Sequence, residues 1–250
     1  MSGNVFKDDA GSVLTKRIDK SDVMPTIVWL EKVTGLELTN NLLGTTGKTS
    51  TSGDLDIAVN ANEVDKNEFA NNLAEYIKKQ GGDPKQWIKK SGVSVHFKTP
   101  IKGDEANGYV QADFMFGEPD WMKWSMQGGT EGSPYKGAHR HILLASIAKS
   151  KGMKWSFQNG LVNRETNDII TKDPNEIAKK LLGQMAGLKD LNNVESILNV
   201  ITRLPNYEEL VADARETLAK DGVELPKAAQ IESVQTGTPN WFRRMMDTIK

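Results

Sequence analysis

The residues best suited to chemistry stand between Gly44 and Val59, a stretch that reads Gly-Thr-Thr-Gly-Lys-Thr-Ser-Thr-Ser-Gly-Asp-Leu-Asp-Ile-Ala-Val. It begins as a small polar loop and continues as an alternating strand, in which Asp54 and Asp56 point to one face and the apolar residues to the other. Two carboxylates this close repel each other unless a cation lies between them. Mg²⁺ binds hard oxygen ligands of this kind and usually keeps phosphates as further partners. The stretch therefore predicts a metal-and-phosphate site.

A P-loop is the alternative for this stretch, because Gly47-Lys48-Thr49 resembles the end of that motif. The P-loop pattern requires a glycine five residues before Gly47, where this chain has Leu42. It also requires a helix directly after the Lys-Thr pair, whereas here more polar loop and then a strand follow. The sequence therefore argues against a P-loop.

A third carboxylate stands on a strand predicted over residues 109–116. The even-numbered residues from Val110 to Phe116 are apolar and share one face, so Asp113 lies on the opposite face. Asp113 joins Asp54 and Asp56 if the two strands are neighbours.

Helix signals surround these strands. Capping residues, apolar spacing and stop signals predict helices from Ser21 or Asp22 to near Gly35, from Asp65 to Gly81-Gly82, and from Asp83-Pro84 through Trp87. Residues 93–98 alternate as a half-buried strand. Further along the chain we expect helices over His141–Lys151, Pro174–Leu182, Val194–Arg203, Tyr207–Lys220 and Asn240–Lys250.

The spacing of these residues is similar to the signature of the polymerase-beta-like nucleotidyltransferases. That signature is an apolar residue with Gly-Ser or Gly-Gly, a spacer of about ten residues, Asp-x-Asp, and a carboxylate on a later strand. Here it reads Leu43-Gly44-Thr45, Asp54-Leu55-Asp56 and Asp113. Over residues 36–185 the order of later motifs also resembles family X DNA polymerases. These motifs are Gly129-Thr130-Glu131-Gly132-Ser133, Lys151-Gly152, Gly160-Leu161 and the Glu176 helix ending in Leu182-Gly183.

The chain departs from the family pattern at four places. Thr45 replaces the family's serine, and the spacer is about one residue shorter. The loop arginines that contact the triphosphate in the family are absent, which leaves Lys48 as the only cation of the loop. Met126-Gln127-Gly128 stands where the family has an aromatic residue before Thr-Gly. The first 20 residues leave no room for the usual N-terminal helix-hairpin-helix domain.

The resemblance implies an α/β (α+β) fold, with a mixed sheet of the nucleotidyltransferase type, packed helices and a helical C-terminal region. It implies a flexible N-terminal arm (1–20), a palm-like catalytic domain (21–135), a helical thumb-like domain (136–222) and a C-terminal tail (223–250).

The resemblance also implies a function: transfer of a nucleotide from an NTP or dNTP to a hydroxyl, most simply a nucleic-acid 3′-OH, with release of pyrophosphate. Asp54 and Asp56 would hold two Mg²⁺ ions, or Mn²⁺, and Asp113 would hold the ion beside the acceptor. The expected phosphate-binding residues are Gly44, Thr45, Lys48, Ser52 and Gly53. Two other functions stay open: transfer to a small molecule, protein or tRNA, and nucleotide binding or assembly without turnover.

Composition limits the partners and the location. The chain has 250 residues, with 32 basic and 33 acidic side chains, a balance unlike that of proteins that coat nucleic acids. Contact with nucleic acid must therefore use local patches, for example Lys85 and Lys89-Lys90.

The absence of cysteine excludes disulfides, thiolate zinc sites and a cysteine nucleophile. Without a long apolar run or an N-terminal apolar segment, we expect no membrane span, no secretory signal and a cytoplasmic location. The oligomeric state stays open.

Several other residues have a structural and a functional interpretation. The sequence favours a surface helix start for His139-Arg140-His141 over contact with a triphosphate, and a structural role for His96. Core packing is favoured over base stacking for Trp121, Trp124 and Trp155. The segment Trp241–Arg244 suits either a partner or intramolecular docking.

Overall fold

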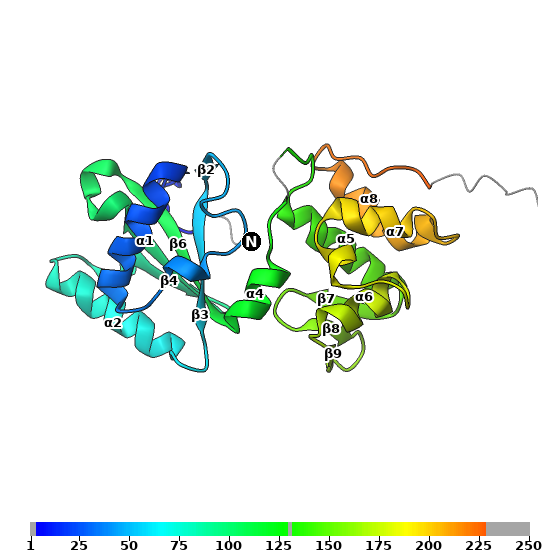
Figure 1. The fold of residues 1–250 in the computed structure, drawn as a ribbon. Helices are drawn as coiled ribbons and strands as arrows, with labels where there is room; N and C mark the ends of the chain where they lie inside the picture. The colour runs from blue at the N-terminus through cyan, green and yellow to red at the C-terminus, as the bar shows by residue number, and fades with distance from the viewer. Residues whose placement is uncertain (1–3, 130–131, 229–250) are drawn as a thin grey trace, which may run out of the picture.

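The computed structural model describes residues 4–129 and 132–228 and has the mixed α/β fold that the sequence predicts. In Figure 1 a half rich in strands, coloured blue to green, lies beside a half rich in helices, coloured green to orange. The short helix α4 (Pro119–Ser125) lies between the two halves (Figure 1).

The sheet that carries the three aspartates has the strand order β3–β6–β5–β4. β3 (Asp54–Asn60) runs parallel to β6 (Tyr109–Gly117). β5 (Ser94–Pro100) runs antiparallel to both β6 and β4 (Ile88–Ser91). The sheet is therefore mixed, and its one parallel pair brings together two strands that are far apart in the chain.

Local signals set the helices of this half where the sequence predicts them. α1 (Lys20–Thr34) ends at Gly35, which takes a left-handed conformation with φ +71°. The Asp65 carboxylate caps α2 (Lys66–Lys79) by accepting two backbone N–H bonds of its first turn. α3 (Pro84–Trp87) starts with proline, again after a capping aspartate.

A first hydrophobic core lies between α1, α2 and one face of the sheet. β3 contributes the residues between and after its aspartates, and β6 contributes its even-numbered residues. These apolar residues are Leu55, Ile57, Val59, Val110, Ala112, Phe114 and Phe116. The three aspartates therefore lie on the opposite face, as the alternation predicts.

Residues 4–19 differ from the expected flexible N-terminal arm, because they pack on the strand-rich half. Phe6 is 1% exposed, and the Lys16 amide donates to the Tyr109 carbonyl at 2.8 Å. β1 (Ile18–Asp19) pairs antiparallel with β2 (Thr51–Ser52), directly before β3. Because the segment is polar overall, its composition alone does not reveal that a few apolar residues hold it in place.

Within residues 132–228, the second half combines four helices with a small antiparallel sheet that the sequence did not predict. The strands are β7 (Met153–Ser156), β8 (Gly160–Asn163) and β9 (Ile169–Thr171). The helices are α5 (Gly137–Ser150), α6 (Pro174–Leu182), α7 (Val194–Ile201) and α8 (Tyr207–Ala219). α5 begins four residues before the predicted start at His141, whereas the other three lie close to their predicted ranges. They enclose a second hydrophobic core, which also includes Ala58 and Met115 from the aspartate face of the first sheet.

Short 3₁₀ helices complete the described elements: η1 (Thr39–Asn41), η2 (Ile101–Gly103), η3 (Glu105–Asn107) and η4 (Leu188–Leu191). Across residues 4–129 and 132–228, none of the helices has the length and apolar character that a membrane crossing needs. The helix expected over Asn240–Lys250 and the segment Trp241–Arg244 lie outside the described residues.

Candidate functional site

The fold brings the three predicted carboxylates together. Because β3 and β6 are parallel neighbours, Asp56 stands directly beside Asp113, and Asp54 is on the same face two residues earlier. Each of the three offers one carboxylate oxygen, and these oxygens all lie within 4.8 Å of one another. Three converging carboxylate oxygens form a ligand set suited to Mg²⁺ or Mn²⁺.

The electrostatics of this cluster favour a bound cation. Asp113 is buried, and Asp54 and Asp56 are half-buried. Burial, and then the charge of Asp113, raises the pKa of Asp54 above its ordinary value. Burial, and then the charges of Asp54 and Asp113, raises the pKa of Asp56 to about 8. A divalent ion would reverse these shifts by stabilising the ionised carboxylates.

Two side chains that the sequence did not assign to the site hold Asp113. His96 Nδ1 lies 2.7 Å from Asp113 Oδ1, and Gln111 Nε2 donates to Asp113 Oδ2 at 3.2 Å. Alternation alone places His96 and Gln111 on the polar faces of their strands. Their contact with Asp113 depends on the pairing of β5 with β6, in which His96 stands opposite Asp113.

The loop that begins at Gly44 lies against Asp56. The Leu43 amide donates to the Asp56 carbonyl at 2.9 Å, and the Asp56 amide donates to Thr46 Oγ1 at 3.1 Å. Gly44 has φ +57°, and a Cβ there would lie 3.6 Å from Asp56 Oδ2. Glycine thus permits the left-handed turn that places this backbone beside the carboxylate.

The other predicted phosphate-binding residues frame the same loop. Thr45 and Gly53 are exposed, whereas Ser52 is buried and its Oγ accepts a bond from the Gly47 amide at 3.2 Å. The Lys48 ammonium folds back and donates to the Gly44 carbonyl at 2.9 Å. All five predicted residues therefore flank the start of β3.

Lys48 is the only cation within the loop sequence, and Arg17 adds a second cation from outside the loop. A Cβ on Gly53 would lie 3.2 Å from Arg17 Nη1, and the Arg17 charge lowers the pKa of Asp54, against the effects of burial and of Asp113. Arg17 also donates to Thr51 Oγ1 and to the Thr51 carbonyl, each at 3.0 Å. Sequence reasoning missed Arg17 because it belongs to the segment expected to be an arm.

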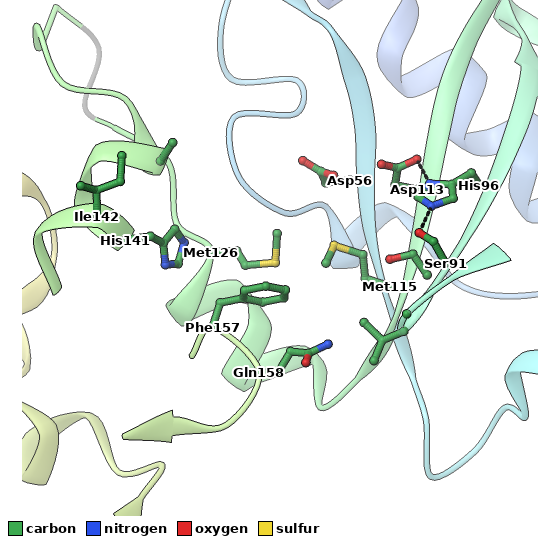
Figure 2. A pocket seen from close by; sticks show the side chains of 14 residues that line it. Asp56, Ser91, His96, Asp113, Met115, Met126, His141, Ile142, Phe157 and Gln158 are labelled. Atoms are coloured by element: carbon green, nitrogen blue, oxygen red, sulfur yellow. Dashed lines mark hydrogen bonds and ion pairs between the residues drawn. The ribbon is translucent and has the colours of Figure 1, made fainter. Parts of the chain in front are cut away.

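A cavity of about 380 Å³ opens beside the aspartates, between the two halves. Figure 2 shows Asp56, Asp113, His96 and Ser91 on one side of it, with His141, Ile142 and Phe157 across from them. Met115 and Met126 lie between the two sides (Figure 2). The cavity therefore offers carboxylates at one wall and apolar side chains at the other.

The His139-Arg140-His141 segment is not the exposed helix start that the sequence favoured. Arg140 is 1% exposed and donates to the carbonyls of Leu191, at 2.6 Å, and Ser125, at 2.8 Å. His139 is also buried, and His141 lines the cavity. Arg140 thus connects α4, α5 and η4 from the interior.

The three tryptophans pack together beside this segment, in accord with core packing. The ring centroids of Trp121 and Trp124 are 5.1 Å apart, and Trp155 lies within 6.4 Å of each. Thr130 and Glu131, from the predicted glycine-rich loop, lie outside the described residues.

Comparison with known proteins gives one kind of match. No protein-family model matches the chain, and no curated protein sequence matches it. Among solved structures, the chain is similar to the polymerase beta of Leishmania infantum, solved as a ternary P/T complex. The TM-score is 0.40 and the sequence identity is 12%, over 71% of this chain and 72% of that one. The case for a function therefore rests on the geometry of the site.

Proposed function

We propose that this protein is a metal-dependent nucleotidyltransferase. It would move a nucleoside monophosphate from an NTP or dNTP to an acceptor hydroxyl and release pyrophosphate. The observation that carries the proposal is the convergence of the Asp54, Asp56 and Asp113 oxygens within 4.8 Å, next to the Gly44 loop.

The three aspartates would hold the metal ions. Asp54 and Asp56 would ligate two Mg²⁺ ions, or Mn²⁺, while Asp113 would ligate the one on the acceptor side. When bound, such a pair supplies positive charge at the attacking and leaving oxygens of an in-line displacement. The chain itself then needs little acid or base chemistry and acts mainly by positioning and by neutralising charge.

The loop before β3 would bind the β- and γ-phosphates. The backbone at Gly44 and Gly53 allows close approach of an oxyanion, and Thr45 and Ser52 add hydroxyl groups. Lys48 and Arg17 would supply the positive charge. The contacts of Arg17 with Thr51 hold its guanidinium group beside Gly53, which supports this role.

The acceptor would enter through the cavity beside Asp113. Its apolar side chains, which include Met115, Met126 and Phe157, suit a nucleobase or another flat apolar group. We propose a nucleic-acid 3′-hydroxyl as the acceptor, with residues 21–135 carrying the catalytic groups and residues 136–222 facing them as a thumb-like region. Transfer to a small molecule, a protein or tRNA is the second candidate, because this cavity also has the size of a small-ligand site.

The test is Mg²⁺-dependent release of pyrophosphate from labelled nucleotides, with primer, gapped DNA, RNA and tRNA as acceptors. Asp54→Asn and Asp56→Asn should each lower the rate by at least about 100-fold, because each removes a charged metal ligand. Asp168→Asn, an exposed aspartate in the second half, is the matched control and should leave the rate unchanged.

Unchanged pyrophosphate release in Asp54→Asn and Asp56→Asn would refute the proposed catalysis. Label that appears in the protein fraction alone would refute the nucleic-acid acceptor and leave nucleotide transfer in place.

A further inference from the structure

His96 lies beside Asp113, at the edge of the cluster of aspartates, and is 1% exposed. It stands opposite Asp113 in the antiparallel pairing of β5 with β6, and its Nδ1 lies 2.7 Å from Asp113 Oδ1. Figure 2 shows Asp113 between Asp56 and His96, with the imidazole ring on the side away from Asp56. A buried ring in this position can fix the orientation of the carboxylate that it contacts.

The direction of the hydrogen bonds follows from the groups involved. An ionised carboxylate only accepts, so His96 Nδ1 carries the proton and donates to Asp113. In the neutral ring, Nε2 then accepts from the Ser91 hydroxyl, 2.8 Å away on β4. A chain of two hydrogen bonds, drawn as dashed lines in Figure 2, thus crosses three neighbouring strands from Ser91 to Asp113.

The second oxygen of Asp113 also has a donor. Gln111 Nε2 donates to Asp113 Oδ2 at 3.2 Å, while Gln111 Oε1 accepts the Val5 amide at 2.9 Å. With one donor on each oxygen, the carboxylate cannot rotate without breaking a buried hydrogen bond. The two donors thus fix the carboxylate in the orientation in which one of its oxygens lies within 4.8 Å of oxygens of Asp54 and Asp56.

We propose that His96 is a positioning residue that orients Asp113 for metal binding, an inference that rests on the proposed function. Groups that hydrogen-bond to a ligand fix its direction, and their loss typically lowers metal affinity by about 10–100-fold. The Nδ1 donor is the essential feature of His96, whereas the Nε2 bond to Ser91 keeps the ring in place.

Two amide substitutions separate the two nitrogen atoms of the ring. His96→Asn keeps an amide N–H near the position of Nδ1, and His96→Gln keeps one near the position of Nε2. His96→Leu removes both. Mn²⁺ affinity, measured without nucleotide by electron paramagnetic resonance or calorimetry, reports on the site independently of turnover.

We expect His96→Leu and His96→Gln to weaken Mn²⁺ binding by about 10–100-fold, and His96→Asn to stay within about threefold of the unaltered protein. Thermal unfolding of each variant checks the fold. If His96→Leu does not fold, the comparison of His96→Asn with His96→Gln decides whether the Nδ1 donor supports Mn²⁺ binding.

Equal Mn²⁺ affinity in the Asn and Gln variants would overturn the role of Nδ1. Affinity that depends on His96 in a protein that transfers no nucleotide would overturn the proposed function alone. Binding that is lost in Asp56→Asn but insensitive to His96 would overturn this inference alone. If the unaltered protein binds no Mn²⁺, both are overturned.

Discussion

At the scale of single residues, Arg17 supplies charge to a loop whose other cation, Lys48, is bonded to the loop itself. Its guanidinium group is held by Thr51 and lies beside Gly53, directly before the first aspartate. We expect Arg17→Ala to raise the nucleotide KM by about tenfold, the effect of one lost charge-assisted hydrogen bond. The kcat should change little, because Arg17 would contact the triphosphate equally in the ground and transition states.

Steady-state kinetics with saturating acceptor checks this prediction. Arg17→Lys should recover part of the loss, and the neighbouring Lys16→Ala is the matched control for a lost charge. An unchanged nucleotide KM in Arg17→Ala would place the triphosphate elsewhere.

His141 makes the stability of the fold depend on pH. Its Nδ1 accepts the indole N–H of Trp155 at 3.0 Å, so the ring is neutral in the folded state. Burial, followed by the charge of Arg140, lowers the pKa of His141 to about 4, below its ordinary value of 6.5. The unfolded state therefore binds more protons between these values, and the stability from His141 is full above pH 6.5 and lost toward pH 4.

Denaturant unfolding at several pH values checks this contribution. Between pH 7 and pH 4 the free energy of unfolding should fall more steeply in the unaltered protein than in His141→Asn. For one proton the difference in slope is at most about 1.4 kcal/mol per pH unit. Parallel profiles would show that His141 titrates alike in both states.

At the scale of elements, the small sheet of the second half depends on a glycine at its first turn. Gly160, the first residue of β8, has φ +71°, and a Cβ there would lie 2.4 Å from the Thr171 carbonyl oxygen. Gly152, before β7, has φ +72° with no atom within 4 Å of such a Cβ. Gly152→Ala should cost about 1–2 kcal/mol for the left-handed conformation alone.

Gly160→Ala should cost clearly more than Gly152→Ala, because the β9 backbone must also move. Chemical denaturation of both variants measures the difference. Equal costs would mean that β8 and β9 separate without loss of stability.

The elements that the sequence predicts are those with local signals. Asp65 and Asp83 cap their helices, and alternation places Asp54 and Asp56 on one face. The strands β7 to β9 have three or four residues each, too few for a period, and form because they pair with each other. The helix α4 also has a local signal, because it begins with proline, although no helix is predicted there from the sequence.

The parts of the site that depend on residue spacing within one strand could be predicted from the sequence. The parts that depend on which strands pair with each other could not. Asp113 reaches Asp56 only because β6 lies next to β3, a contact that no short stretch of sequence encodes. The same holds for His96, which lies on β5, and for Arg17, which directly precedes β1. Arg140 is a different case, because a charged residue at a helix start is usually exposed, and here two carbonyl groups allow its burial.

At the scale of the whole molecule, the aspartate face of the first sheet also contributes to the core of the second half. β3 and β6 present apolar residues to the first core on one face. On the other face Ala58 and Met115 join the second core just beyond the aspartates. The cavity beside Asp113 is lined from both halves, so any change in their separation would change the path proposed for the acceptor.

The net charge of −1 requires that a nucleic-acid acceptor use a local group of lysines. Lys85, Lys89 and Lys98 line a cavity of about 370 Å³ with residues of the N-terminal segment. Lys89 pairs across the strands with His96, and Lys98 follows His96 by two residues on β5, so both stand on the aspartate face. A strand that reached Asp113 along this end of the face would pass Lys89 and Lys98, with Lys85 lining the same cavity.

We expect Lys85→Ala combined with Lys89→Ala to raise the KM for a primer by several fold and to leave the nucleotide KM unchanged. Each lost phosphate contact should also reduce the slope of log affinity against log salt by about 0.7–0.9. The exposed pair Lys179→Ala and Lys180→Ala on α6 is the control, with the same change of charge on the second half. Titrations of primer binding from 50 to 200 mM salt decide between acceptors. A slope that these lysines do not affect would favour a small-molecule acceptor, because a single hydroxyl compound has no row of phosphates for them to bind.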